Sequence, residues 1–97
     1  MRTEKDIRRE ICEYLDTFPQ CIFRINHEDR RRMKSKYLPK GWPDISGSFG
    51  SRAMYFEVKT PDGTIRQDQV KFMDRARAQG AICGFVTSVD DVREALS

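Results

Sequence analysis

The spacing of apolar residues changes along the chain and divides it into elements. The first apolar series has helical spacing and consists of Ile7, Ile11, Tyr14, Leu15 and Phe18. It predicts a helix over residues 4–17 that ends before Pro19. Thr3 followed by Asp6 resembles a capping box at the start of this helix, with Asp in place of Glu.

Three strands are expected after this helix. The β-branched and aromatic residues of 21–26 predict the first, and a long loop over 27–41 follows. Segments 45–49 and 54–59 are joined by a tight turn and predict an antiparallel hairpin. In the second of these strands an apolar face alternates with a face that carries Tyr55, Glu57 and Lys59.

The last third of the chain predicts a helical crossover to one more strand. Thr64 and Gln67 have capping-box spacing, so we expect a helix from residue 64 to about 79. Its inward stripe carries Gln69, Phe72, Met73 and Ala76, of which Gln69 is polar and needs polar partners. Residues 81–87 predict a strand buried on both faces, and Ser88 caps a final helix over 89–96. The predicted order is αβββαβα.

Length and composition narrow the class of protein. The 97 residues predict a single domain, 1–97, with 38% hydrophobic and 34% charged residues. The apolar runs are too short for a transmembrane span, and the first residues lack the apolar core of a signal peptide, so we expect a cytoplasmic protein. The odd count of three cysteines predicts reduced, buried thiols; a zinc site with His27 is a weak alternative, because no metal-ligand spacing is present.

Positive charge is concentrated in one part of the chain. Residues 1–42 hold 11 Lys and Arg against 7 Asp and Glu, whereas residues 43–97 hold 7 against 8. A basic cluster beside Tyr37 has no acid and contains Arg30, Arg31, Arg32, Lys34, Lys36 and Lys40. We expect most of this cluster, together with Arg24, to contact the phosphates of DNA. The simpler alternative is a solvated loop.

The hairpin places chemically useful residues at one end. Its antiparallel pairing brings Asp44, which follows Pro43, near Glu57 and Lys59. Two converging carboxylates repel each other unless a divalent cation binds between them, and such oxygen ligands suit Mg²⁺ or Mn²⁺. A lysine on the same face can orient an attacking water and offset charge on a phosphodiester in its transition state. The alternative is an exposed Glu57–Lys59 pair of little energetic value.

These motifs together carry a family resemblance. The sequence resembles the virus-type replication–repair nuclease (VRR-NUC) domain of the PD-(D/E)xK nuclease superfamily over nearly its whole length. The resemblance lies in Gly41-Trp42-Pro43-Asp44, in Glu57-Val58-Lys59-Thr60-Pro61-Asp62-Gly63, and in Gln69-Val70-Lys71-Phe72. Trp42 and Arg66 depart from the smaller residues usual there. The resemblance implies an α/β fold, the restriction-endonuclease-like αβββαβ core with a mixed central sheet flanked by helices.

The resemblance also implies roles for single residues. Asp44, Glu57 and the Val58 carbonyl would hold Mg²⁺ or Mn²⁺, Lys59 would be the catalytic lysine, and Gln69 would reach into the site. Glu10 would match the acidic residue of the first helix that joins the metal, with Glu13 a close competitor. Products would carry 5′-phosphate and 3′-hydroxyl ends.

The expected function is therefore a metal-dependent DNA endonuclease. Stand-alone copies of this domain resemble phage proteins, tend to be homodimers, and are similar to enzymes that cut branched DNA such as four-way (Holliday) junctions. Two alternatives stay open: a relative that binds DNA without cutting it, and a regulatory protein-binding module. Loss of turnover with retained DNA binding in Lys59→Ala would separate the enzyme from the binding module.

Overall fold

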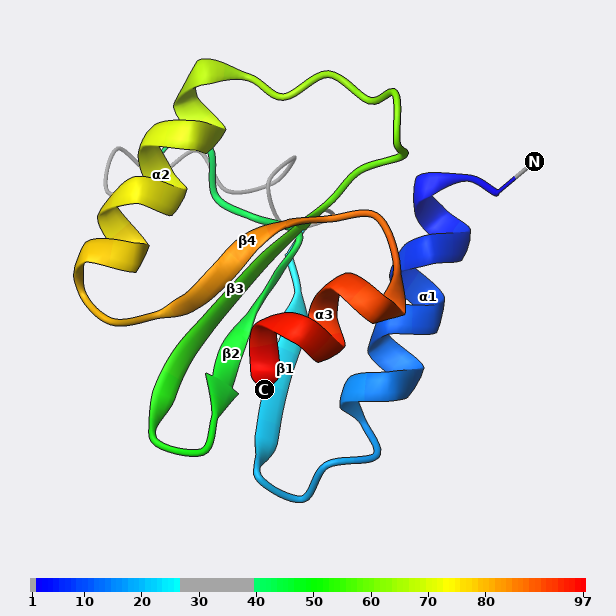
Figure 1. The fold of residues 1–97 in the computed structure, drawn as a ribbon, viewed down its shortest axis with the longest axis vertical. Coiled ribbons are helices and arrows are strands. Elements are labelled where there is room, and N and C mark those ends of the chain that lie inside the picture. The colour runs from blue at the N-terminus through cyan, green and yellow to red at the C-terminus, as the bar shows by residue number, and fades with distance from the viewer. Residues whose placement is uncertain (1, 27–39) are drawn as a thin grey trace.

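The computed structural model describes residues 2–26 and 40–97. Its elements follow the order α1 (Glu4–Leu15), β1 (Cys21–Ile25), β2 (Ile45–Phe49), β3 (Arg52–Val58), α2 (Gln67–Ala78), β4 (Ile82–Val86) and α3 (Val89–Leu96) (Figure 1). This is the αβββαβα order predicted from the sequence. In the described ranges, the helices are too short or too polar to span a bilayer.

The four strands form one mixed sheet in the order β1-β2-β3-β4. The first three strands are antiparallel neighbours, and β4 pairs with β3 in parallel. A parallel pair needs a crossover connection, which α2 provides between β3 and β4. The mixed sheet flanked by helices confirms the predicted restriction-endonuclease-like fold class.

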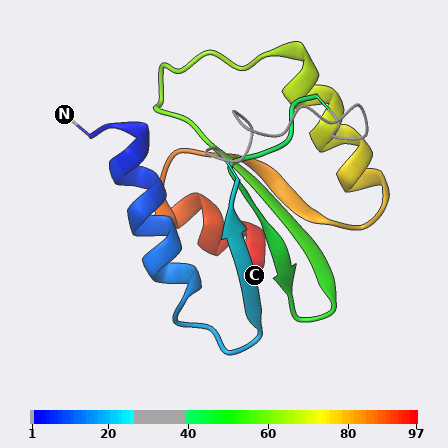
Figure 2. The same cartoon turned by 180° about the vertical axis from the view of Figure 1, so that it is seen from behind.

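One face of the sheet carries the main hydrophobic core. Helices α1 and α3 lie side by side against this face (Figures 1 and 2), and Arg93 of α3 sits 5.2 Å from the centre of the Tyr14 ring of α1. The register places Ile45 opposite Phe56, so both point to this face. The buried core consists of Ile7, Ile11, Leu15, Ile45, Met54, Phe56, Val58, Ile82, Val86 and Val92.

The opposite face carries the polar side chains and is only partly covered. Tyr55 and Glu57 alternate with the core residues of β3 and therefore point to this second face. Helix α2 packs there against β4 and β3, with Met73 and Ala76 buried beneath it. Over β1, no helix of the described residues covers the second face, and Ile22 keeps 75% of its surface exposed.

Two helix boundaries differ from the prediction. Helix α1 ends at Leu15, two residues early, with Asp16 as its C-cap. Helix α2 begins at Gln67 and not at Thr64, because Gln69 and not Gln67 supplies the capping amide. The Gln69 side-chain Oε1 accepts a hydrogen bond from the Arg66 N–H at 3.0 Å. The capping pair is therefore displaced by two residues from the one that the spacing suggested.

The prediction that residues 81–87 are buried on both faces is wrong for the centre of β4. Cys83, Gly84 and Phe85 are only half-buried, because β4 is an edge strand and has a neighbour on one side alone. The three cysteines are free and half-buried, not fully buried as expected. Burial nonetheless raises the pKa of each thiol, which disfavours the reactive thiolate form.

Candidate active site

The β2–β3 hairpin brings Asp44 directly against β3. The Asp44 N–H donates a hydrogen bond to Glu57 Oε1 at 3.1 Å, and the Val58 N–H donates one to Asp44 Oδ2 at 3.0 Å. The Glu57 carboxylate is thus held by the Asp44 backbone, and the Asp44 carboxylate is held by the backbone of Val58, the residue after Glu57. This reciprocal pair sits where β2 begins and β3 ends, as the alternation of the hairpin predicted.

Glu57 also joins the hairpin to α2 and to Lys59. The Gln69 Nε2 donates a hydrogen bond to Glu57 Oε2 at 3.1 Å, and Lys59 Nζ lies 3.7 Å from the same oxygen. All four side chains are buried, with exposed fractions of 4% for Asp44 and Glu57, 9% for Lys59 and 1% for Gln69. The structure therefore brings together the four residues that the sequence singled out, and we call them the Glu57 cluster.

The segment before Asp44 is held by β1. Asn26, at the end of β1, is buried, and its Nδ2 donates to the Pro43 carbonyl at 3.1 Å and to Ser46 Oγ at 2.8 Å. Its backbone N–H donates to the Asp44 carbonyl at 2.7 Å. Asn26 therefore fixes the backbone on both sides of Asp44. Sequence analysis gave Asn26 no role at this site, because its partners lie 17 or more residues away.

Gly41 allows the same segment to touch α2. Gly41 has φ +81°, and a Cβ built there would lie 2.3 Å from the Asp68 carbonyl oxygen and 2.9 Å from the Gln69 nitrogen. Only glycine fits such a close backbone approach at positive φ. The first turn of α2, which carries Gln69, is therefore seated on the segment that carries Asp44.

The donor set of the Glu57 cluster suits a hard divalent cation. Two buried carboxylates, Asp44 and Glu57, lie at the same end of the hairpin, and Lys59 forms an ion pair with Glu57. Magnesium is commonly bound by one or two carboxylates with waters and substrate phosphate, so Asp44 and Glu57 fit it. Within residues 2–26 and 40–97, no three His, Cys, Asp or Glu side chains form a metal-binding group. Further ligands would be backbone carbonyls, such as that of Val58, or water.

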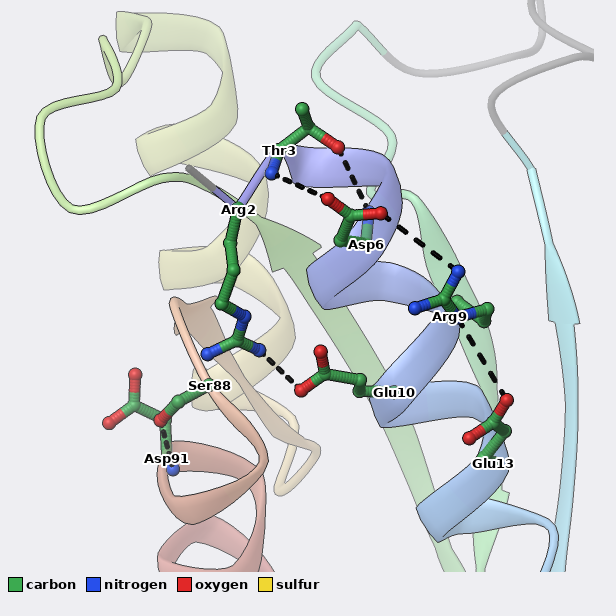
Figure 3. A network of polar contacts seen from close by, with 8 residues as sticks. All are labelled: Arg2, Thr3, Asp6, Arg9, Glu10, Glu13, Ser88 and Asp91. Carbon is green, nitrogen blue, oxygen red and sulfur yellow. Dashed lines mark hydrogen bonds and ion pairs between the residues drawn. The ribbon is translucent and has the colours of Figure 1, made fainter.

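Glu10 lies in a different polar network. Figure 3 shows its carboxylate pointing to Arg2, with which it forms a hydrogen-bonded ion pair. Glu13 pairs instead with Arg9, and its side chain is 70% exposed. The structure thus does not bring either acid into a three-acid group with Asp44 and Glu57.

The expected DNA-binding residues are divided between two regions. Arg24 is exposed on β1, and its alternation with Phe23 and Ile25 places it on the second face, which also carries Glu57. The remaining five lie in 27–39, outside the residues that the structure describes; they are Arg30, Arg31, Arg32, Lys34 and Lys36.

Three aromatic residues form a cluster that sequence reasoning missed. Trp42, Tyr55 and Phe72 pack edge to face, with ring centroids 5.1–5.9 Å apart. Phe72 was expected in the core with Met73 and Ala76, yet it is only half-buried. No signal in the sequence links residues 42, 55 and 72, because they come from three separate elements.

Comparisons with known proteins support the fold. No protein-family model matches the sequence, and no curated protein matches it. Among solved structures, a VRR_NUC domain protein is similar, with a TM-score of 0.68, 14% sequence identity, and coverage of 99% of this chain and 86% of that chain. At that identity the likeness concerns the fold alone. The chain therefore has the α/β fold of a VRR_NUC domain, with a buried Asp–Glu–Lys–Gln cluster on the second face of its sheet.

Proposed function

We propose that this protein is a metal-dependent deoxyribonuclease that hydrolyses phosphodiester bonds in branched DNA. The observation that carries the proposal is the Glu57 cluster: two carboxylates, a lysine and a glutamine, all buried and in contact, on a VRR_NUC-like fold. Buried ionisable side chains in mutual contact are typical of functional sites, so this group is a candidate functional site.

The metal ligands in this proposal are Asp44, Glu57 and the Val58 carbonyl. Mg²⁺ or Mn²⁺ bound there supplies a Lewis acid that polarises a phosphate and lowers the pKa of a water. Because Glu10 is engaged with Arg2, its assisting role requires that it leave this partner. Glu10→Gln, compared with Glu13→Gln, tests that role through the affinity for Mn²⁺ measured by calorimetry.

The other residues of the cluster position groups and charge. Lys59 offsets the negative charge that grows on the phosphate and orients the attacking water. Gln69 holds the Glu57 carboxylate in one orientation, because it donates to Oε2 while its own oxygen is fixed by the Arg66 N–H. Hydrolysis adds water across the P–O3′ bond and leaves 5′-phosphate and 3′-hydroxyl ends.

The finer substrate proposal is a four-way junction cut by a homodimer, as in stand-alone phage-type enzymes of this fold. One copy of the cluster acts on one strand at a time. Paired cuts in a symmetric junction need two copies at a fixed separation, which a two-fold dimer supplies.

Binding to the substrate is assigned to the basic residues. Arg24 shares the sheet face of Glu57 and would contact phosphates next to the cluster. Arg30, Arg31, Arg32, Lys34 and Lys36 would add contacts without reading the base sequence. Loss of one contact should lower the slope of log affinity against log salt by about one.

We place the activity in the cytoplasm, where three free cysteines stay reduced. The single domain 1–97 is proposed to carry the complete catalytic site.

Cleavage of end-labelled DNAs tests this function. A four-way junction, a flap, plain duplex and single strand are each incubated with purified protein and Mg²⁺, Mn²⁺ or EDTA. We expect paired, symmetric cuts in the junction with either metal and none with EDTA. Cuts in all DNAs alike would leave a nuclease without structural selectivity. Tight DNA binding with no product in any reaction would contradict the proposed nuclease activity. It would instead support a module that binds DNA without cutting it.

A further inference from the structure

A cavity of about 280 Å³ lies between α2 and the second face of the sheet. The cavity is lined by Trp42, Tyr55 and Phe72, by Ala53 of β3, by Arg75 of α2, and by Gln79, the C-cap residue of α2. The cavity is slightly smaller than the roughly 300–1,000 Å³ typical of small-molecule sites. It is large enough for one flat ring system and too small for stacked base pairs.

The aromatic walls are built differently from the core. Met73 and Ala76, the neighbours of Phe72 on α2, are buried, whereas the three aromatic rings are only half-buried. The rings contact one another edge to face, and all three line the cavity, so a flat ring placed there would contact aromatic side chains.

Each aromatic residue adjoins a member of the Glu57 cluster. Trp42 precedes Asp44 by two residues, and Phe72 follows Gln69 by one turn of α2. Tyr55 precedes Glu57 by two residues on the same face of β3, which is about 7 Å along the strand. The cavity therefore continues the face of the Glu57 cluster toward the β2–β3 turn.

We propose that this cavity binds one unpaired nucleobase of the DNA substrate, from a nucleotide adjacent to the scissile phosphate. The base would stack on the aromatic walls, as bases do on single-strand-binding surfaces. Arg75, exposed at the margin, would hold the phosphate of that nucleotide. The inference rests on the proposed nuclease function; in a fully paired four-way junction, the base would leave its partner at the branch point to enter the cavity.

The single tryptophan makes the proposal directly measurable. Trp42 is the only tryptophan of the chain, so its fluorescence reports the cavity alone. A flap DNA is titrated in EDTA, which prevents cleavage, and compared with flaps that carry one abasic site at successive positions. We expect the intact flap to quench Trp42, and one abasic position near the branch to abolish the quenching and weaken binding roughly five- to a hundredfold.

Variants separate the cavity from general DNA binding. Phe72→Leu keeps an apolar side chain but removes the stacking ring, and Arg75→Gln removes the charge at the margin. Arg77→Gln is the matched control, because Arg77 is on the same helix but pairs with Asp74 and does not line the cavity. We expect Phe72→Leu to weaken binding to the intact flap and not to the abasic one. Arg75→Gln should weaken binding to both flaps, because an abasic nucleotide keeps its phosphate. Circular dichroism melting shows that both variants fold.

The outcomes distinguish this inference from the proposed function. Metal-dependent cleavage with no quenching and no abasic effect at any position would contradict base binding in the cavity. It would not contradict the proposed nuclease function. Quenching that depends on one base, without cleavage in any metal, would support the base site and contradict the nuclease. If Phe72→Leu changes the mass measured by sedimentation equilibrium and not the quenching, the cavity is an interface with a second copy, and the base site is wrong.

Discussion

Glu57 is the residue on which the candidate site depends most. Its carboxylate accepts hydrogen bonds from the Asp44 N–H and the Gln69 amide and forms an ion pair with Lys59. These partners come from three parts of the chain. Glu57 can therefore keep all of its contacts only when the hairpin and α2 are packed together correctly. A buried carboxylate without such partners would be strongly unfavourable.

Gln69→Leu should lower both stability and cleavage. It removes the donor to Glu57 Oε2 and the acceptor of the Arg66 N–H, at a cost of about 1–3 kcal/mol. Denaturant unfolding and cleavage rates with Mg²⁺ measure the two effects. Gln67→Leu is the control, because Gln67 is exposed in the same helical turn. Equal effects of the two variants would contradict the positioning role of Gln69.

Asn26→Ala should disturb Asp44 without touching it. The substitution leaves the buried Pro43 carbonyl and the Ser46 hydroxyl without their Asn26 donor, which costs about 1–3 kcal/mol. We expect a lower melting temperature and a lower cleavage rate, with Mn²⁺ affinity reduced in calorimetry. Unchanged Mn²⁺ affinity in a folded variant would show that Asn26 does not position the carboxylates.

The residues that meet within one hairpin were predictable. Strand alternation put Glu57 and Lys59 on one face, and the turn put Asp44 beside them. Gln69 was predictable as a polar residue on an apolar stripe. Asn26 and the aromatic cluster were not, because their contacts depend on how separate elements pack. That Asp44, Glu57, Lys59 and Gln69 act in catalysis stays a prediction.

At the scale of elements, the packing of α2 against residues 41–44 positions the side chains of the site. Gly41 touches the Asp68 and Gln69 backbone, and Trp42 packs against Phe72 at a centroid distance of 5.1 Å. Helix α2, whose start the sequence spacing placed at Thr64, begins at Gln67, and this tertiary contact lies in its first turn. Similarly, the exposure of β4 follows from its edge position, which periodicity alone does not reveal.

Gly41→Ala should push the start of α2 away from the hairpin. The positive φ alone costs about 1–3 kcal/mol for a non-glycine residue, and the new Cβ would overlap the Asp68 carbonyl. We expect a lower melting temperature and a loss of cleavage that exceeds the loss of folded protein. Gly84→Ala is the control, because nothing lies within 4 Å of a Cβ there. A fully active Gly41→Ala would contradict this account of the α2 contact.

The start of α1 gives a pH-dependent prediction. The Thr3 N–H and hydroxyl hydrogen bonds hold the pKa of Asp6 below its usual range, with Arg9 contributing attraction. A carboxyl with a lowered folded-state pKa adds stability above its unfolded pKa of about 3.9, and this is lost as the pH falls through the folded value. Asp6→Asn should therefore flatten the acid side of the melting-temperature profile, whereas Glu4→Gln, in the same turn, should change it less.

At the scale of the whole molecule, the second face of the sheet is where we expect a substrate to lie. It carries the Glu57 cluster, Arg24 and the aromatic cavity, while α1 and α3 close the opposite face (Figure 2). The fold class was predictable because the order αβββαβ and one crossover helix leave few sheet topologies. The strand order and the partial cover of the second face were not, since no local pattern encodes them.

The proposed homodimer predicts a solution mass of twice 11.4 kDa. Sedimentation equilibrium at several protein concentrations measures it, with and without junction DNA. A mass of one chain at all concentrations, together with unpaired cuts in the junction, would contradict the dimer and leave a monomeric nuclease.

The central claim is that the buried cluster around Glu57 performs metal-dependent cleavage, and Lys59→Ala tests it most directly. Cleavage of an end-labelled four-way junction in Mg²⁺ and binding of the same DNA in EDTA are measured for the wild type, Lys59→Ala and the exposed control Lys71→Ala. We predict that Lys59→Ala cleaves roughly 100- to 1,000-fold more slowly with DNA affinity nearly unchanged, while Lys71→Ala cleaves like the wild type. Cleavage by a folded Lys59→Ala at the wild-type rate would contradict the claim.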